Sequence, residues 1–378
     1  MKKAVSVVVP CYCVKDEYFD GLMTSLLNQT LGKEKLEIVL VDDGSPDDTY
    51  EKLQEYERRE PETIMVIRCS ENGGPGAART IGLSYATGEY VAFADQDDWV
   101  DLAMYQILYE KGKEYDCDVV KCDWCREENM YEPIASELQE IGEFIEIQSK
   151  EERQELFEIK DLGGYWAALY QRNMLIENEI FFPSGVFYDD NFFAGLVCFY
   201  GKRYFFCQDK MYHWYVNTES VSMKKSISRH TDRLKVELLL LEELRVRGIE
   251  AEFHDYVEAA FFERYFLNTM GTLITRQGGM PLSLWQIMRT QLFHNCPNFK
   301  ENPIIQKKFG YLYKENWVGF IAQWSMLNLE ELQGNDKFLA EYEVLKHYSF
   351  MELIFMENLT QPQWELIQFC YMVLQCLR

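Results

Sequence analysis

The sequence lacks any run of about 18 apolar residues, the length that a helix needs to cross a bilayer, so we expect no membrane-spanning segment. It is also poor in positive charge: 38 lysines and arginines stand against 62 acidic residues, and the formal net charge is −24. Nucleic acids bind to basic surfaces, and anionic membranes attract basic segments. The charge therefore argues against a nucleic-acid partner and against a purely electrostatic hold on a membrane.

Targeting and disulfide signals are lacking too. The segment MKKAVSVVVPCYC is basic at its start, but its apolar run is short and interrupted by Pro10, so it predicts a strand rather than a signal peptide. The 11 cysteines follow no regular framework, which predicts reduced thiols and a cytoplasmic protein. Cys122 and Cys125 form the only Cys-x-x-Cys pair, and no second pair stands at zinc-finger spacing, so this pair alone does not indicate a metal or redox site.

The first 125 residues alternate between two patterns. Short β-branched apolar runs predict strands, and runs with apolar residues at helical spacing predict helices. We expect strands at 4–10, 36–41, 63–69, 89–94 and 117–124. We expect helices at 18–30, 45–59, 74–88 and 102–115, and we expect Ser45 to cap the second helix. This succession implies a parallel sheet with right-handed crossovers and helices on both faces.

The rest of the sequence divides into three stretches. Residues 126–160 are acidic and poorly patterned, which predicts a surface excursion, and residues 161–222 are rich in aromatic residues. From Thr231 onward the pattern is helical. We therefore expect an α/β domain at 1–230, with a mostly parallel, Rossmann-like sheet flanked by helices, and a helical C-terminal domain at 231–378.

Polar residues gather where the expected strands end. In an open parallel sheet, ligands bind beyond the carboxyl ends of the strands, so the residues that follow the strands should meet at one edge. In chain order these residues are Pro10, Tyr12, Asp42, Asp43, the glycine-rich turn at 73–76, Asp95, Asp97 and Asp98. We expect a ligand site there.

This set of residue types suits a nucleoside diphosphate with a divalent metal. The ring of Tyr12 can stack on a base, and the carboxylate of Asp43 can accept a base N–H. The turn at 73–76 opens a helix and offers backbone N–H groups to an anion. Carboxylates beside a phosphate need a cation between them, and Mg²⁺ or Mn²⁺ binds both kinds of oxygen. The plainer alternative for either acidic cluster is a solvated turn that caps the next helix.

Two common nucleotide-binding motifs are absent: no G-x-G-x-x-G follows the first strand, and no G-x-x-x-x-G-K-[ST] occurs. Instead, five segments resemble, in order, the family 2 glycosyltransferases, which have the GT-A fold. They are VSVVVPCYCVKDEYFDGLMTSLLNQT, LEIVLVDDGSPDDT, ENGGPGAARTIGLSYATGEYVAFADQDDWV, FYDDNFF and YHWY with the following SVS. The resemblance covers residues 4–222. It implies an inverting enzyme that moves a sugar from a nucleotide donor to an acceptor hydroxyl.

The resemblance also implies the residues that bind the donor. Those around the base are Pro10, Tyr12 and Asp43. Asp95 is implied to contact the ribose or the sugar, and Arg79 to contact the donor. Asp98 is implied either to support the site or to contact the sugar.

The metal and the base follow from the same resemblance. Asp97 is implied as the metal ligand, and His213 as a further metal or diphosphate contact. Asp190 is implied as the catalytic base. For His213 a satisfied core histidine is an equal alternative. The sequence departs from the family pattern at Cys13, where asparagine is usual, and a cysteine cannot make the hydrogen bonds of an asparagine.

The expected chemistry depends on charge. A Mn²⁺ or Mg²⁺ ion neutralises the diphosphate leaving group, and a carboxylate base takes the proton of the acceptor hydroxyl. A single displacement inverts the anomeric centre without an enzyme nucleophile. The resemblance implies a UDP-sugar donor, hexosyl or N-acetylhexosaminyl, and a saccharide or lipid-linked saccharide acceptor, in the synthesis of a bacterial surface polysaccharide.

Two rival functions remain open. A sugar-nucleotide nucleotidyltransferase shares the sheet, but it should carry a basic, glycine-rich loop after the first strand, where PCYCVKDEYFD is neither. A non-catalytic scaffold is the other rival, and the intact Asp97 and Asp190 argue against it. For the helical region we weigh a homodimer contact, an acceptor site and peripheral contact with the inner face of the membrane, and the acidic charge favours a protein contact.

Overall fold

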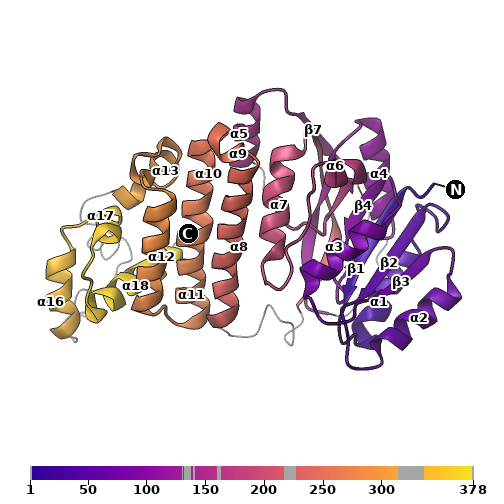
Figure 1. The fold of residues 1–378 in the computed structure, drawn as a ribbon, viewed down its shortest axis with the longest axis horizontal. Helices are drawn as coiled ribbons and strands as arrows, with labels where there is room; N and C mark the ends of the chain where they lie inside the picture. Colours follow the sequence, from indigo (N-terminus) through magenta and orange to yellow (C-terminus); the bar gives the residue numbers. More distant parts are fainter. Residues whose placement is uncertain are drawn as a thin grey trace. The chain divides into compact units, whose positions relative to one another are not determined.

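The computed structural model describes residues 2–129, 131, 138, 141–159, 163–216, 227–313 and 336–376. The chain divides into two compact units, Met1–Lys224 and Lys225–Arg378. In the first unit helices cover a sheet, and in the second unit every element drawn is helical (Figure 1). The α/β fold with an additional helical region agrees with the expectation.

The described part of the first unit is built on a nine-stranded sheet. Half of the sheet is parallel: β1 (Val5–Cys11) pairs with β2 (Leu36–Asp42) and with β4 (Tyr90–Phe93), and β3 (Ile64–Arg68) pairs with β2. Every residue of β1, β2 and β4 is buried. Continuous apolar runs of this kind are what a sheet covered on both faces requires.

The other half of the sheet is mixed, which corrects one expectation. The predicted fifth strand, β6 (Val119–Glu127), does not pair with β4, because β8 (Ala168–Gln171) lies between them and runs antiparallel to both. Beyond β6 comes the long β9 (Arg203–Tyr215), which is parallel to β6, followed by the short β5 (Trp99–Val100). A strand that returns from a distant part of the sequence has no local signature, so the order could not be predicted from periodicity.

Four helices of the first unit match the expected ones closely: α1 (Asp16–Leu27), α2 (Thr49–Arg59), α3 (Pro75–Tyr85) and α4 (Met104–Glu114). The expected Ser45 cap is wrong. The backbone N–H of Ser45 donates to Asp42 Oδ1 at 3.0 Å, and its hydroxyl accepts from the N–H of Cys13 at 3.2 Å. Ser45 therefore belongs to the turn after β2, and α2 begins only at Thr49.

The expectation of a surface excursion at 126–160 is also partly wrong. Here β7 (Gly142–Glu146) pairs antiparallel with β9, and α5 (Lys150–Ile159) follows it. No residue of β7 is fully buried. A half-exposed edge strand carries polar residues, which is why its sequence looks unpatterned. The described unit also contains α6 (Arg172–Glu177) and α7 (Asp189–Tyr200).

In its described part, the second unit contains helices and no strand. One long helical run passes from α10 (His254–Phe261) through a π-helical stretch (Phe262–Asn268) into α11 (Thr269–Gln277). The other elements are α8 (Ile227–Val246), α9 (Ile249–Glu252), α12 (Leu282–Asn295), α13 (Pro303–Lys308), α16 (Asp336–Leu345), α17 (Phe350–Phe355), α18 (Gln361–Cys376) and short 3₁₀ turns at Phe299–Glu301 and Gly310–Tyr313. Over the described ranges, none of these helices has the length and apolarity needed to cross a membrane.

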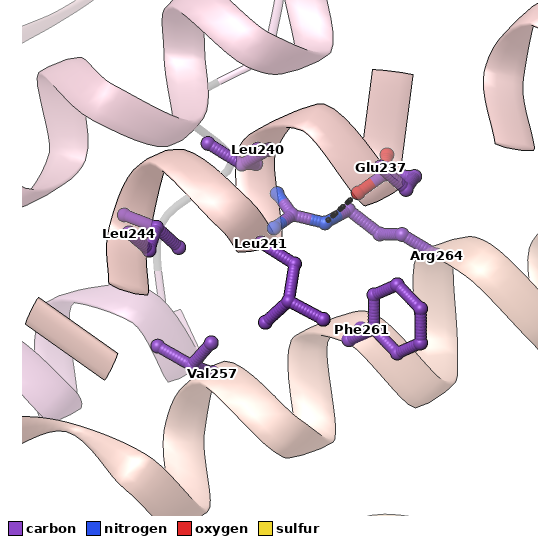
Figure 2. Close-up of a pocket in the computed structure, with 7 residues that line it drawn as sticks. All are labelled: Glu237, Leu240, Leu241, Leu244, Val257, Phe261 and Arg264. Atoms are coloured by element: carbon purple, nitrogen blue, oxygen red, sulfur yellow. Dashed lines mark ion pairs between the residues drawn. The ribbon is translucent and has the colours of Figure 1, made fainter. Parts of the chain in front are cut away.

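The second unit contains a small cavity beside α8 (Figure 2). Its polar feature is an ion pair in which Nε of Arg264, on the π-helical stretch, lies 3.2 Å from Oε2 of the buried Glu237. The cavity volume is only about 10 Å³, which is about the room for one water molecule. It is a packing defect rather than a binding site.

Candidate functional site

The ends of β1 and β4 meet, as the parallel topology requires. The backbone N–H of Tyr12 donates to Gln96 Oε1 at 2.8 Å, and the Gln96 amide donates back to the Tyr12 carbonyl at 3.1 Å. Pro10 is buried on β1, whereas Tyr12 is 43% exposed and its ring is accessible to a ligand. The expected convergence of strand ends is therefore present.

Asp43 is held by the glycine-rich turn. Its Oδ1 accepts from the N–H of Gly73 at 2.9 Å and its Oδ2 from the N–H of Gly74 at 2.8 Å. The side chain is buried, which raises the pKa of Asp43, and the two N–H groups act in the opposite direction. Gly74 has a φ of 83°, a conformation that glycine adopts without strain. The anion bound by these two amides is therefore the protein's own carboxylate, which corrects the expectation that they bind a ligand phosphate.

Arg79, on α3, joins two acidic segments. Its Nη1 donates to Asp189 Oδ2 at 2.6 Å, and its Nη2 donates to Asp95 Oδ1 at 2.8 Å. Gly76 makes this approach feasible, because a Cβ there would lie 2.9 Å from Asp189 Oδ2 and 2.2 Å from the carbonyl oxygen of Pro183. The guanidinium thus connects the segment after β4 with the start of α7.

The three carboxylates after β4 have different surroundings. Asp95 and Asp97 are partly exposed, whereas Asp98 is 1% exposed. Asp98 Oδ2 accepts from the hydroxyl of Tyr212 at 2.7 Å, and its Oδ1 accepts from the N–H of Tyr215 at 2.8 Å. Burial raises the pKa of Asp98 well above its ordinary value, and the charges of Asp95 and Asp97 raise it further. Of the two implied roles of Asp98, supporting the site fits this geometry and direct sugar contact does not.

Asp189 and Asp190 open α7. Tyr188, just before them, has a φ of 67°, which a bulky residue rarely adopts, so the backbone is held in a strained conformation where the two acids begin. Burial raises the pKa of Asp190 from 3.8 to about 6, and the charge of Asp189 adds to the shift while Arg79 opposes it. Asp190 is only partly exposed, and its pKa of about 6 lies well above that of an ordinary aspartate.

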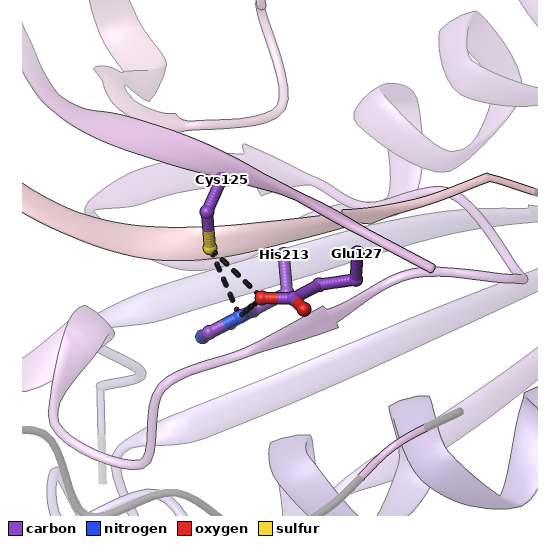
Figure 3. Close-up of side chains that lie close together, drawn as sticks. All are labelled: Cys125, Glu127 and His213. Carbon is purple, nitrogen blue, oxygen red and sulfur yellow. Dashed lines mark hydrogen bonds and ion pairs between the residues drawn. The ribbon is translucent and has the colours of Figure 1, made fainter. Parts of the chain in front are cut away.

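His213 lies on β9 with partners from β6 (Figure 3). Its Nδ1 is 2.9 Å from Glu127 Oε1 and 3.1 Å from Cys125 Sγ, and its ring stacks on Trp99 with centroids 5.5 Å apart. Among the described residues, these three side chains form the group that could hold an ion, with ligand atoms within 4.8 Å of one another, and Asp97 is not in it. Nδ1 is thus engaged by the two side chains from β6, and His213 is only 4% exposed.

The Cys-x-x-Cys pair does not act as a unit. Cys122 is buried in the core and its thiol lies 3.5 Å from the carbonyl oxygen of Ala167, whereas Cys125 faces His213. Residues three apart on a strand point to opposite faces.

Two tyrosines of the site were missed by the sequence analysis. The hydroxyl of Tyr165 donates to Asp95 Oδ1 at 2.9 Å, and the Arg79 guanidinium carbon lies 4.6 Å from the centre of its ring. The hydroxyl of Tyr212 donates to Asp98 and accepts from the N–H of Asp95 at 3.2 Å. The aromatic-rich pattern alone indicates core, but the place of Tyr212 beside His213 in the YHWY segment was a usable signal.

Comparison with known proteins gives consistent results. Residues 6–177 match the family model described as "Glycosyl transferase family 2". The uncharacterized glycosyltransferase YibD of Escherichia coli K12 is 31% identical over 58% of this chain and 63% of its own length, so the chain spans less than two thirds of that relative. The cholesterol galactosyltransferase of Borreliella burgdorferi is 25% identical over 96% of this chain and 92% of its own length.

Solved structures show the same fold. The crystal structure of Staphylococcus aureus TarS aligns with a TM-score of 0.54 and 21% identity, and covers 83% of this chain and 56% of the TarS chain. TarS 1–349 in complex with UDP-GlcNAc aligns with a TM-score of 0.52 and 19% identity, over 82% of this chain and 93% of that chain.

Proposed function

We propose that this chain, whose residues 6–177 match the model of glycosyl transferase family 2, transfers a sugar from a nucleotide-sugar donor to a hydroxyl of a saccharide acceptor, with inversion. The observation that supports this most is the placement of Asp190. It follows Asp189 at the start of α7, and Arg79 joins Asp189 to Asp95 after β4. A base and a donor segment are thus fixed to each other by one guanidinium.

Asp190 acts as the general base in this proposal. A base must be deprotonated at the working pH and still attract a proton strongly, which favours a pKa near neutral. The pKa of Asp190, raised to about 6 by burial, meets both requirements. It removes the proton of the acceptor hydroxyl as that oxygen attacks the anomeric carbon, and the bond to the diphosphate breaks on the opposite side.

The donor binds at the strand ends. Tyr12 offers an exposed ring for the base of the nucleotide, and Asp43, fixed by Gly73 and Gly74, accepts a base N–H. Asp95 contacts the ribose or the sugar. We propose UDP as the nucleotide, in line with the UDP-GlcNAc present in the structure of TarS 1–349. Arg79 and Asp98 serve the site indirectly, because Nη1 and Nη2 of Arg79 and both carboxylate oxygens of Asp98 bind other protein groups.

The acidic residues fit a divalent cation. Asp95, Asp97 and Asp98 are close enough for their charges to raise the pKa of Asp98, and a cation would relieve that repulsion. Mg²⁺ or Mn²⁺ would be held by Asp97 and, through Nε2, by His213, and when bound it would neutralise charge on the diphosphate. The carboxylate of Glu127 on Nδ1 would orient the imidazole for that purpose.

We also propose that the catalytic part ends near residue 230 and that the helical part begins there. We propose that the helical part helps bind the acceptor at the cytoplasmic face of the membrane, where a lipid-linked saccharide is available. Support comes from the Borreliella relative, which aligns over both parts and is named for a lipid, cholesterol. A homodimer through this part is the alternative.

The test is the Asp190→Asn variant. We expect it to lose transfer from a UDP-sugar while keeping the affinity for UDP measured by calorimetry. Asp209→Asn, at a partly exposed carboxylate on β9, is the control and should keep both. Unchanged transfer in Asp190→Asn would exclude Asp190 as the base, and absence of transfer by the wild type with any acceptor would favour the scaffold alternative. Release of pyrophosphate from a nucleoside triphosphate and a sugar phosphate would favour a nucleotidyltransferase.

A further inference from the structure

Three tryptophans form a cluster: Trp124 on β6, Trp214 on β9, and Trp166 in the turn before β8. The ring centroid of Trp124 lies 5.5 Å from that of Trp166 and 6.1 Å from that of Trp214, both edge to face. The parallel register explains the arrangement, because Trp124 pairs with Tyr212, and Arg126 pairs with Trp214. Alternate residues of adjacent strands share a face, so this face is the one opposite Cys125 and His213.

The tryptophan cluster is accessible. Trp124 is 42% exposed, and Trp166 and Trp214 are partly exposed. An exposed indole in contact with two others is an apolar patch of a kind that soluble proteins rarely keep without a ligand or partner. Trp166 packs against the core, whereas Trp124 leaves part of its indole open to a ligand.

The cluster is continuous with the candidate donor site. The ring of Trp166 stacks on Tyr212 with centroids 4.3 Å apart. The hydroxyl of that same Tyr212 donates to Asp98 at 2.7 Å. Tyr165, the neighbour of Trp166, donates to Asp95 at 2.9 Å. The acidic segment after β4 is therefore linked to the cluster through Trp166 and its contact with Tyr212.

The chemistry of the cluster indicates its ligand. One face of a pyranose ring presents C–H groups with partial positive charge, and the face of an indole carries partial negative charge. The hydroxyls at the ring edge need polar partners, and exposed Arg126, whose guanidinium carbon lies 5.8 Å from the Trp214 ring centre, offers several donors. A sugar that must meet the donor has to lie beside the donor site, which is where this cluster is.

We propose that Trp124, Trp166 and Trp214 form the subsite that binds a pyranose ring of the acceptor. This inference rests on the proposed function and adds the place and the chemical class of the acceptor contact. Trp124 provides the stacking face, and Tyr212 couples the occupied subsite to the acidic segment. The pyranose contact is thereby made by β6, β9 and the turn before β8 in the first unit.

The test uses the full chain labelled with 5-fluorotryptophan and fluorine NMR, in the presence of UDP and Mg²⁺. The sequence contains 8 tryptophans, and single Trp→Phe variants assign their signals. The probes are methyl α- and β-pyranosides of glucose, galactose and N-acetylglucosamine. We expect at least one of them to shift the three cluster signals saturably, while the signals of the fully buried Trp285 and Trp364 stay unchanged. No shift with any probe, or equal shifts for all tryptophans, overturns the proposal.

Two variants sharpen the result. Trp124→Ala should weaken the binding of the shifting pyranoside about tenfold, the loss of one stacked aromatic contact. Tyr85→Ala, at a tyrosine of the same unit that is 52% exposed, should bind it like the wild type. Both positions are exposed, so both variants should fold. Equal affinities of the two variants contradict the proposal.

Two further measurements separate a lipid ligand of the tryptophan cluster from a failure of the proposed transferase function. If short-chain phosphatidylcholine micelles move the cluster signals and sugars do not, the cluster is a lipid-facing patch and the proposal is wrong. Stabilisation of the protein by UDP is measured separately by thermal unfolding. If sugars shift the cluster signals and UDP does not stabilise the protein, the sugar subsite is supported and the proposed transferase function is contradicted. If UDP stabilises the protein and no sugar shifts the signals, the transferase function is supported and the subsite is contradicted.

Discussion

Arg79 and Asp189 are 110 positions apart in the chain, yet Nη1 of Arg79 donates to Oδ2 of Asp189 at 2.6 Å. Both side chains are buried, with exposed fractions of 7% and 6%. The other arm of the guanidinium binds Asp95. A planar group with several fixed N–H donors can hold two carboxylates at once, which an ammonium group cannot do in the same way.

Removing this guanidinium should destabilise the fold. Arg79→Gln leaves Asp189 buried without its partner, and we expect a loss of about 3 kcal/mol in the free energy of unfolding, measured by urea denaturation. Adding Asp189→Asn to Arg79→Gln should restore part of it. Arg58→Gln, which breaks an exposed pair with Glu55, is the control and should change stability by less than about 0.5 kcal/mol. Equal effects of Arg79→Gln and Arg58→Gln would show that the buried pair is not structural.

The pH dependence of transfer should follow Asp190. The pKa of Asp190 is raised to about 6, so the base is protonated below that pH and ionised above it. We expect log kcat/KM to rise with pH at a slope of one below about pH 6 and to level off above it. A profile that is flat between pH 5 and 8 would exclude Asp190 as the base.

The raised pKa of Asp190 also predicts that stability falls with rising pH, whereas activity rises. Since the folded protein holds this proton up to about pH 6 and the unfolded chain only to 3.8, stability falls as the pH rises between these values. At pH 7, Asp190→Asn, which cannot ionise, should be more stable than the wild type by on the order of 2 kcal/mol. At pH 3 the two should be alike. A variant that is less stable at pH 7 would show that the ionised carboxylate stabilises the fold.

Nucleotide binding should depend on metal and on Asp97. We would measure thermal unfolding with UDP, GDP, dTDP and CMP, each with and without Mn²⁺. A ligand at about 100 times its Kd adds about 2.7 kcal/mol to stability. We expect UDP to stabilise the wild type only with Mn²⁺, and Asp97→Ala to abolish the effect. Asp123→Ala, at an exposed acid on β6, is the control and should behave like the wild type.

Cys13 should tolerate asparagine with a gain in stability. Its φ is 49°, in the left-handed region, where asparagine is less strained than cysteine. We expect Cys13→Asn to raise the free energy of unfolding by roughly 0.5 to 1 kcal/mol in urea denaturation. Cys69→Asn, at a position without a positive φ, should give no gain. A loss at position 13 would mean that the thiol makes a contact worth more than the backbone strain.

The sequence was informative where a signal is local. The runs that became β1, β2 and β4 are mostly apolar and buried throughout, so the sheet edge and the polar residues beyond it could be placed from periodicity and topology. The family resemblance supplied the roles of Asp97 and Asp190. Asp97 follows β4 and Asp190 opens α7, and both lie in segments that resemble the family.

The sequence did not predict contacts between residues that lie far apart in the chain. Nothing near Gly73 indicates that its N–H binds Asp43 rather than a phosphate, because both are anions. Nothing near Asp98 indicates that β9 covers it, and nothing near β4 indicates that β8 pairs with it. These contacts depend on the order of the strands, which local patterns do not encode.

The burial of Asp98 under β9 has a consequence for how the chain matures. Its hydrogen-bond partners, Tyr212 and Tyr215, lie 114 and 117 positions further along the chain. A nascent chain in which β1 to β4 have already paired therefore still has this acidic segment unsupported, and a domain of such long-range pairings folds slowly. Asp98 therefore gains its two hydrogen-bond partners only when β9 has been synthesised and has paired with the sheet.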